Sequence, residues 1–358
     1  MNYSSFFRLI VSIGFCFALF YCSDTKGQTL PNPEIKEGIA TLSGKITNLH
    51  PVRKTDNLKL TLIVPYLINT ENFSYPTTVN EDGIFSFEVP MQCNYAIGYI
   101  RMNFYDYDGF NVCLASGKET KIELVYDETA RLKIVDQIDS LGLTSTDLFN
   151  INRVLNRSII SHPPGFTGYF KTPDEFMKRA KITLNYRLKI IEENNALSEI
   201  AKHYIANNVK IHTLDWRLLR NREIMQIYSN AGNEDVAFLN FHEPKKYYAF
   251  LKDFDLNNPQ YLYQAHYLEV LNMILSNETL NIPPIGDTPV DQWMKKTRKI
   301  LSKLVGFDKG LFYDLLAANS YAQQFNDKLK PLSDKQIKNI NHYFKGEKEE
   351  IAKILLKK

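Results

Sequence analysis

The chain has 358 residues, of which 44% are hydrophobic and 23% are charged, and its formal net charge at pH 7 is +3. This composition is that of a globular protein, and it excludes a disordered chain, a collagen and a dense disulfide scaffold. So small a net charge gives no electrostatic reason to expect nucleic acid as a partner, because nucleic-acid binding uses a strongly basic face. At about 150 residues per domain, the length predicts two or three domains.

Residues 1–27 have the pattern of an export leader. Arg8 and the amino terminus give a positive start, and the apolar run Leu9–Tyr21 follows. This run is shorter than the roughly 20 residues that cross a bilayer, and it fits the core of a secretory signal. We therefore expect an exported protein, either in the periplasm or anchored to a membrane of the cell envelope. The alternative is an uncleaved anchor or a buried helix.

Two processing routes are open for this leader. Thr25-Lys26-Gly27 offers small residues at the two positions that a signal peptidase reads, and cleavage there leaves Gln28 first. In the other route, Leu19-Phe20-Tyr21-Cys22 resembles a lipoprotein box, and acylated Cys22 anchors the protein to a membrane. Leu19 fits that box, whereas Tyr21 stands where a small residue is expected.

Export also changes the meaning of the four cysteines, because two of them lie in the leader. Only Cys93 and Cys113 remain, and they face an oxidising compartment. A tight hairpin around Asp108-Gly109 pairs Cys113 with position 104, so the two cysteines are not cross-strand partners in that register. Two buried thiols are therefore expected, with a disulfide across a sandwich as the alternative.

Residues 37–137 have the pattern of short strands separated by turns. Asp82-Gly83 predicts a hairpin turn, since glycine accepts the positive φ that such a turn needs. After it, Phe85, Phe87 and Val89 alternate with polar residues, which is the period of a strand covered on one face. About seven such strands without long helices between them predict an antiparallel β-sandwich.

Beyond residue 140 the apolar residues recur every three or four positions, as in helices. Thr172-Pro173-Asp174-Glu175 predicts a helix start. Thr172 is the capping residue, Pro173 takes the first helical position, and the side chain of Glu175 can reach back to the backbone N–H of Thr172. The same start chemistry recurs at Asn258-Pro259, Thr288-Pro289-Val290-Asp291 and Ser333-Asp334-Lys335-Gln336. The predicted class is α+β with segregated parts. Its parts are a leader at 1–27, an antiparallel β-sandwich domain at 37–137 and an all-α helical domain at 140–358.

The sequence carries no familiar motif for catalysis or metal binding. Cys-x-x-Cys, His-Glu-x-x-His, Gly-x-Ser-x-Gly and a glycine-rich phosphate loop are all missing from the 358 residues. A thiol exchanger needs an exposed thiolate and a resolving partner nearby. We therefore expect no catalytic residue, no cofactor and no metal ligand.

Two aromatic clusters in helical segments provide the candidate binding residues, which are Tyr247, Tyr248, Tyr263 and Tyr267. Tyrosine rings line clefts that bind sugars or peptides, because they combine an apolar face with a polar tip. The alternative is packing between helices with the hydroxyl groups at the rim.

The order of leader, sandwich and helical block carries a resemblance, together with the stretches Val79–Phe87, Gly310–Ala322, Pro331–Gln336 and Ile351–Leu355. The chain resembles the accessory region of TlpA-like thiol–disulfide oxidoreductases of the Bacteroidota type. In that family a thioredoxin-like domain with Trp-Cys-x-x-Cys follows the helical block, and no position here matches its redox cysteines.

The resemblance implies a non-catalytic protein of the cell envelope that acts through contact with a protein partner or a redox client. The alternative is an exported lipoprotein that binds a glycan or a peptide in a cleft lined by the four tyrosines. An enzyme with an unfamiliar site is the third reading of the sequence.

Overall fold

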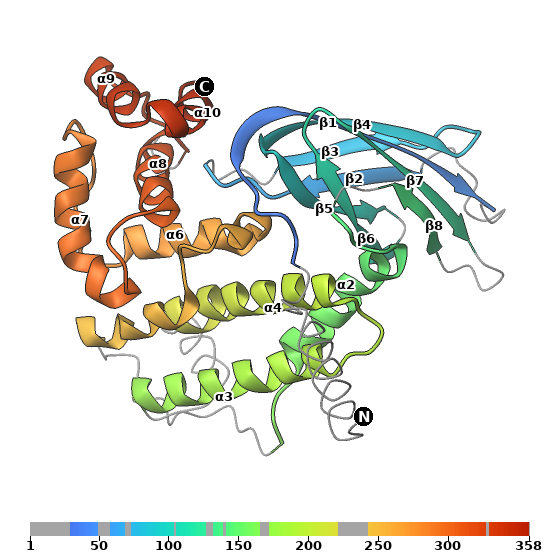
Figure 1. Ribbon diagram of the computed structural model, residues 1–358, viewed down its shortest axis with the longest axis horizontal. Coiled ribbons are helices and arrows are strands. Elements are labelled where there is room, and N and C mark those ends of the chain that lie inside the picture. The colour runs from blue at the N-terminus through green and yellow to red at the C-terminus, as the bar shows by residue number, and fades with distance from the viewer. Residues whose placement is uncertain are drawn as a thin grey trace, which may run out of the picture.

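The computed structural model describes residues 29–48, 58–68, 73–103, 105–126, 132–138, 141–164, 172–220, 243–326 and 329–357. The leader predicted at 1–27, with Cys22, lies outside these residues. Within them the strands come first and the helices follow, so the predicted α+β class with segregated parts is confirmed (Figure 1).

The β part consists of two four-stranded sheets. The first has the order β4 (Ile84–Cys93), β1 (Ile35–Thr47), β7 (Glu119–Tyr126) and β8 (Leu132–Ile138). The second has the order β3 (Phe73–Thr78), β2 (Lys59–Val64), β5 (Tyr95–Met102) and β6 (Tyr105–Ala115). Neighbouring strands run antiparallel except β1 and β7, which are parallel. This exception arises because β7 enters its sheet by a crossover from the other sheet and not through a hairpin.

The turn predicted at Asp82-Gly83 is present, but it does not form a hairpin. Gly83 has a φ of 80°, and its N–H donates to the carbonyl of Asn80 at 2.9 Å. The flanking strands, β3 and β4, belong to different sheets, so the turn passes the chain from one sheet to the other. A positive φ determines a local reversal, whereas the apolar faces decide which strands pair.

The register predicted for the strands around Asp108-Gly109 is wrong. Cys113 pairs with Ile97, because β6 already begins at Tyr105 and Gly109 lies inside that strand. A Cβ on Gly109 would collide with the ring of Tyr99, so this glycine serves a close approach and not a turn. Cys93 and Cys113 are both buried, and neither takes part in a disulfide, so the predicted pair of buried thiols is confirmed.

The helical part consists of α-helices joined by shorter helical turns. The α-helices are α2 (Ser145–Ile160), α3 (Pro173–Glu192), α4 (Glu199–Thr213), α6 (Ala265–Ser276), α7 (Val290–Val305), α8 (Leu311–Asn326), α9 (Asp334–Tyr343) and α10 (Glu349–Leu356). The shorter turns are the π-helical η2 (Leu214–Leu219) and the 3₁₀ segments η4 (Lys245–Phe254), η5 (Pro259–Tyr263) and η6 (Gly346–Lys348). Within the described ranges, no helix combines the length and the apolar character needed to cross a membrane.

Three of the four predicted helix starts agree with the structure. The side chain of Asn258 accepts the N–H of Gln260 at 3.0 Å at the start of η5. The hydroxyl of Thr172 accepts the N–H of Glu175 at 3.2 Å, and α3 follows with a proline in its first turn. Ser333 and Gln336 form a complete capping box at the start of α9. Thr288 is not a cap, because α7 begins at Val290 and leaves it one residue too far from the helix.

Two hydrophobic cores hold the fold together, and each includes residues from both sides of the predicted domain boundary. The first fills the sandwich around Leu42 and continues to Ile151 of α2 and Ile205 of α4. The second lies among the helices and includes Leu67 and Cys93 from the β part. The apolar surface buried between the two parts therefore stabilises their contact, by about 25 cal/mol for each Å² removed from water.

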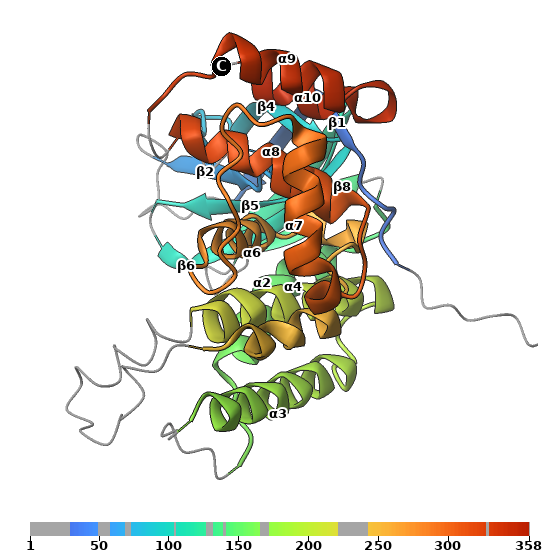
Figure 2. The same ribbon diagram turned by 90° about the vertical axis from the view of Figure 1, so that its left-hand side faces the viewer.

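Polar contacts from two helices reinforce this joint. Asn319 of α8 donates to the carbonyl of Leu67 at 2.9 Å in a buried position. A carboxylate oxygen of Glu350 on α10 accepts the N–H of Glu37 on β1 at 3.1 Å. Figure 2 shows the helices stacked along the sandwich, from α3 at one end to α9 and α10 at the other.

Candidate functional site

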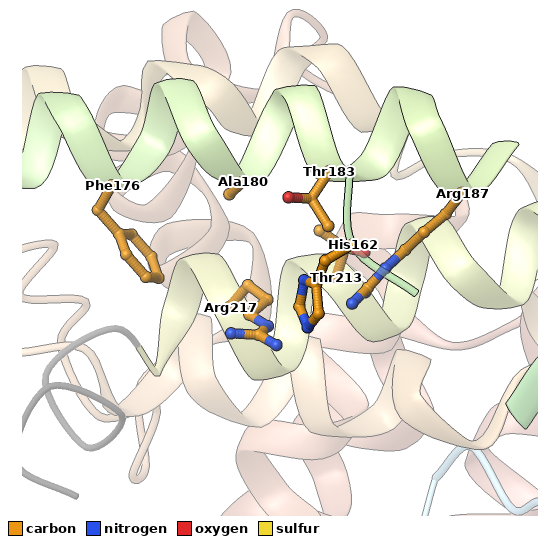
Figure 3. Close-up of a pocket in the computed structure, with 7 residues that line it drawn as sticks. All are labelled: His162, Phe176, Ala180, Thr183, Arg187, Thr213 and Arg217. Carbon is orange, nitrogen blue, oxygen red and sulfur yellow. The ribbon is translucent and has the colours of Figure 1, made fainter. Parts of the chain in front are cut away.

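A pocket lies between α3 and the helix formed by the end of α4 and the segment η2 (Figure 3). Its lining residues are Phe176, Ala180, Thr183 and Arg187 of α3, Thr213 of α4, Arg217 of η2 and His162, which follows α2. The pocket offers about 10 Å³ to the centre of a water-sized group. That is roughly the space that one small polar group needs.

Each of the two helices contributes a threonine and, four residues later, an arginine. Thr183 and Arg187 share one face of α3, because side chains four apart in a helix are neighbours. Thr213 ends α4 and Arg217 lies one turn later in η2. Figure 3 shows both pairs directed into the same space, with the ring of His162 between the two guanidinium groups in that view. π-Helical turns such as η2 are rare and occur frequently at functional sites.

Arg187 is the most deeply buried charged group of the pocket, with a relative exposure of 1%. Its Nε donates to the carbonyl of Ser161 at 3.1 Å, just beyond the end of α2. Its Nη2 has no hydrogen-bond partner among the described residues, and neither have the buried hydroxyl groups of Thr183 and Thr213. Buried polar groups without partners are rare in folded proteins. Three of them in one small pocket indicate a place for a polar ligand.

The pocket is also positively charged. In the part of the chain that the structure describes, neither Arg187 nor Arg217 forms an ion pair with a carboxylate. Burial and then the charge of Arg217 lower the pKa of Arg187 to about 10. Burial, followed by the two arginines, lowers the pKa of His162. Arginine stays charged at neutral pH, so two like charges face one cavity.

A neighbouring cluster around Asp215 differs from the pocket, because its charged groups pair with one another. Asp215 of η2 is 1% exposed, and one of its oxygens accepts the Nε–H of Arg220 at 2.9 Å. Its other oxygen lies 3.0 Å from Nδ1 of His266 on α6. Arg220 reaches Glu269 as well, at 3.3 Å. Each of these side chains has a partner within the cluster, so the cluster joins η2 to α6.

Two histidines that are far apart in the sequence meet beside this cluster. The rings of His212 and His266 lie edge to face with their centroids 5.0 Å apart. Burial and then the proximity of His266 lower the pKa of His212 to about 4, so His212 is neutral at pH 7. Among the described residues, no three His, Cys, Asp or Glu side chains converge in a way that could hold a metal ion.

The four tyrosines predicted as ligand contacts lie in the interior and away from the pocket. Tyr247 and Tyr248 contact each other edge to face, with centroids 5.3 Å apart, and both belong to the helical core. Tyr263 donates to a backbone carbonyl near the start of the β part at 2.9 Å. The hydroxyl of Tyr267 donates to a backbone carbonyl of the helical part. Their rings face protein atoms in this structure, as expected for the packing alternative.

A second hollow, with about 390 Å³ available, lies beside α8. Its lining residues are Leu275, Ser276, Ile282, Pro283, Pro284, Ile285, Gly286, Ser320, Gln323 and Gln324. They are all uncharged, and none has a buried side-chain atom without a partner. The hollow therefore carries no sign of the ligand class it would take, in contrast to the pocket under α3.

Sequence patterning alone does not single out the Thr–Arg pairs of the pocket. The available signal is the position of Arg187, which lies three helical turns after Phe176 on the apolar face of α3. A charged residue on an apolar face is almost never fully buried without a partner. Thr213 and Arg217, the other pair of the pocket, have no such signal in the sequence, because only the fold brings them opposite α3.

Comparison of the chain with models of known protein families gives no match, and comparison with curated proteins gives none either.

Proposed function

We propose that the chain is an exported, non-catalytic protein of the cell envelope that acts through contact with another protein. It is equivalent in this proposal to the accessory region of a TlpA-like thiol–disulfide oxidoreductase, whose sequence it resembles. The observation that carries the proposal is the joint between the sandwich and the helices, because both cores include residues from the two parts.

Such a joint suits a protein that holds a partner in place. Domains connected by small polar interfaces move relative to one another, whereas a large apolar interface prevents this motion. Here α2 covers β6, and α10 lies against β1. The buried bond from Asn319 to the carbonyl of Leu67 fixes the helices on the sandwich further. A partner docked on this body would meet one rigid surface.

The cysteines of the sandwich support the non-catalytic part of the proposal. Burial raises the pKa of the Cys93 thiol to about 12, so almost no thiolate forms at neutral pH. Cys113 is 1% exposed and lies in the other core. Thiol exchange needs an accessible thiolate. Redox chemistry near this protein would therefore have to come from its partner.

Two measurements on the whole chain test the proposal. In an insulin-reduction assay with dithiothreitol we expect no rate above that of buffer, and turnover that disappears when Cys93 and Cys113 are replaced by alanine would contradict the non-catalytic role. In a calorimetric titration with a TlpA-type thioredoxin-like domain, its Cys-x-x-Cys replaced by Ser-x-x-Ser, we expect saturable binding. An unrelated thioredoxin is the control, and equal heats from both proteins would remove the contact role.

A further inference from the structure

We propose that the pocket between α3 and η2 binds a carboxylate group that is attached to an apolar group. The proposal is independent of the function proposed above, since it depends only on the groups that face this pocket. Four features of the pocket support the proposal: its unpartnered hydrogen-bond donors, its uncompensated positive charge, its size and the apolar wall at one end.

The donors of the pocket fit the two oxygens of a carboxylate. The guanidinium of Arg187 is planar, and its Nη2 is directed into the pocket without a partner among the described residues. Planar guanidinium groups bind carboxylates through two parallel N–H···O bonds. The hydroxyl groups of Thr183 and Thr213 are buried, unpartnered and able to donate to the same oxygens.

The charge of the pocket requires an anion. Arg187 and Arg217 approach one another closely enough for the charge of Arg217 to lower the pKa of Arg187. The nearest carboxylate of η2, on Asp215, already accepts from Arg220 and His266 and is not available. A single anion between the two arginines would replace their repulsion by two attractions and would offset the desolvation of the buried guanidinium.

The size and the walls of the pocket select the kind of anion. The space of about 10 Å³ admits one water-sized group, such as one carboxylate oxygen, and the pocket is open to solvent, so the rest of the ligand would lie at its mouth. A phosphate would have to place three or four oxygens, which is more than this space admits. Phe176 and Ala180 line the end of the pocket away from Arg187 (Figure 3). They would contact an apolar group beside the carboxylate. Two sources share this chemistry, namely a free organic acid and the carboxyl terminus of a peptide with an apolar last residue.

Calorimetric titration of the whole chain tests the class of ligand and separates the two sources. The probes are benzoate, its neutral analogue benzamide, inorganic phosphate, and an acetylated Ala-Phe peptide as the free acid and as the amide. We expect benzoate or the peptide acid to bind, and benzamide and the peptide amide to bind at least tenfold more weakly. If the peptide acid binds tenfold more tightly than benzoate, the natural ligand is the carboxyl terminus of a peptide. If benzoate binds tenfold more tightly than the peptide acid, the natural ligand is a free organic acid. Equal binding of acid and amide, tighter binding of phosphate, or no binding of either acid would overturn the proposal.

Variants locate the binding in this pocket. Arg187→Met should weaken the better acid at least tenfold, and Thr213→Val should weaken it severalfold, since each removes a donor. Arg179→Met is the matched control, because Arg179 lies on the same helix and does not line the pocket. It should bind like the unaltered chain. Should Arg187→Met fail to fold, Thr183→Val and Arg187→Lys give the same test by smaller changes. Unchanged affinity in the folded Arg187 and Thr213 variants would refute the site.

Discussion

Replacing Arg187 by methionine should make the ligand-free protein more stable. A pKa of about 10 for this side chain lies well below the usual value for arginine. At 1.36 kcal/mol per pH unit, the buried charge costs the fold roughly 3 kcal/mol. Because the folded state has the lower pKa, this cost applies in full below pH 10 and fades as the pH rises through that value.

The substitution also removes the bond from Nε to the carbonyl of Ser161. A hydrogen bond to a charged group contributes about 1.5 kcal/mol or somewhat more. Methionine fills irregular apolar space well, so we expect little loss of packing. The net result is a gain of about 1 to 1.5 kcal/mol in the free energy of unfolding, from relief of the charge minus the lost bond.

Urea unfolding at pH 7 in low-salt buffer without carboxylates measures this change. The urea midpoint should rise in Arg187→Met, with an unchanged slope of the free energy against urea concentration. In the control Arg179→Met the free energy of unfolding should change by less than about 0.5 kcal/mol. A loss of about 2 kcal/mol or more in Arg187→Met would show instead that Arg187 is a structural cross-link between α2 and α3 and that its buried charge does not destabilise the fold.

Three further predictions concern the rest of the molecule. Asp215→Asn should cost about 2 to 3 kcal/mol, because it removes the buried carboxylate that Arg220 and His266 share, while Arg220 keeps its contact with Glu269. Asp253→Asn, in an exposed ion pair, should cost less than about 1 kcal/mol, and similar urea midpoints for the two variants would contradict this. Cys93 and Cys113 should not react with Ellman's reagent in the native protein and should both react in urea, since both are buried, and rapid labelling of the native chain would argue against that burial. Palmitate labelling of cells should depend on Cys22 if the lipoprotein route operates, and a label retained in Cys22→Ser would rule that route out.

Local chemistry made much of this fold predictable from sequence. The alternation of Phe85, Phe87 and Val89 with polar residues gave the buried face of β4, because a strand turns successive side chains to opposite faces. The capping residues Thr172 and Ser333 gave the starts of α3 and α9, because they satisfy backbone N–H groups within one turn. Both signals arise within a few residues and need no knowledge of the rest of the chain.

Tertiary contacts decided the features that sequence did not reveal. The glycine of Asp108-Gly109 makes room for the ring of Tyr99 inside a strand, which cannot be told from a turn glycine without the partner strand. The pocket requires α3 to lie over η2, and about 30 residues of chain separate Arg187 from Arg217. No periodic pattern encodes that arrangement. The same is true of the parallel pairing of β1 and β7.

Crystals grown with 4-bromobenzoate test directly, through the anomalous signal of bromine, whether the buried charge of Arg187 binds a carboxylate ligand. We predict a carboxylate within about 3 Å of Nη2 of Arg187, with the ring and its bromine toward Phe176. Bromobenzoate bound only elsewhere, with the guanidinium of Arg187 paired to a protein carboxylate, would contradict this prediction.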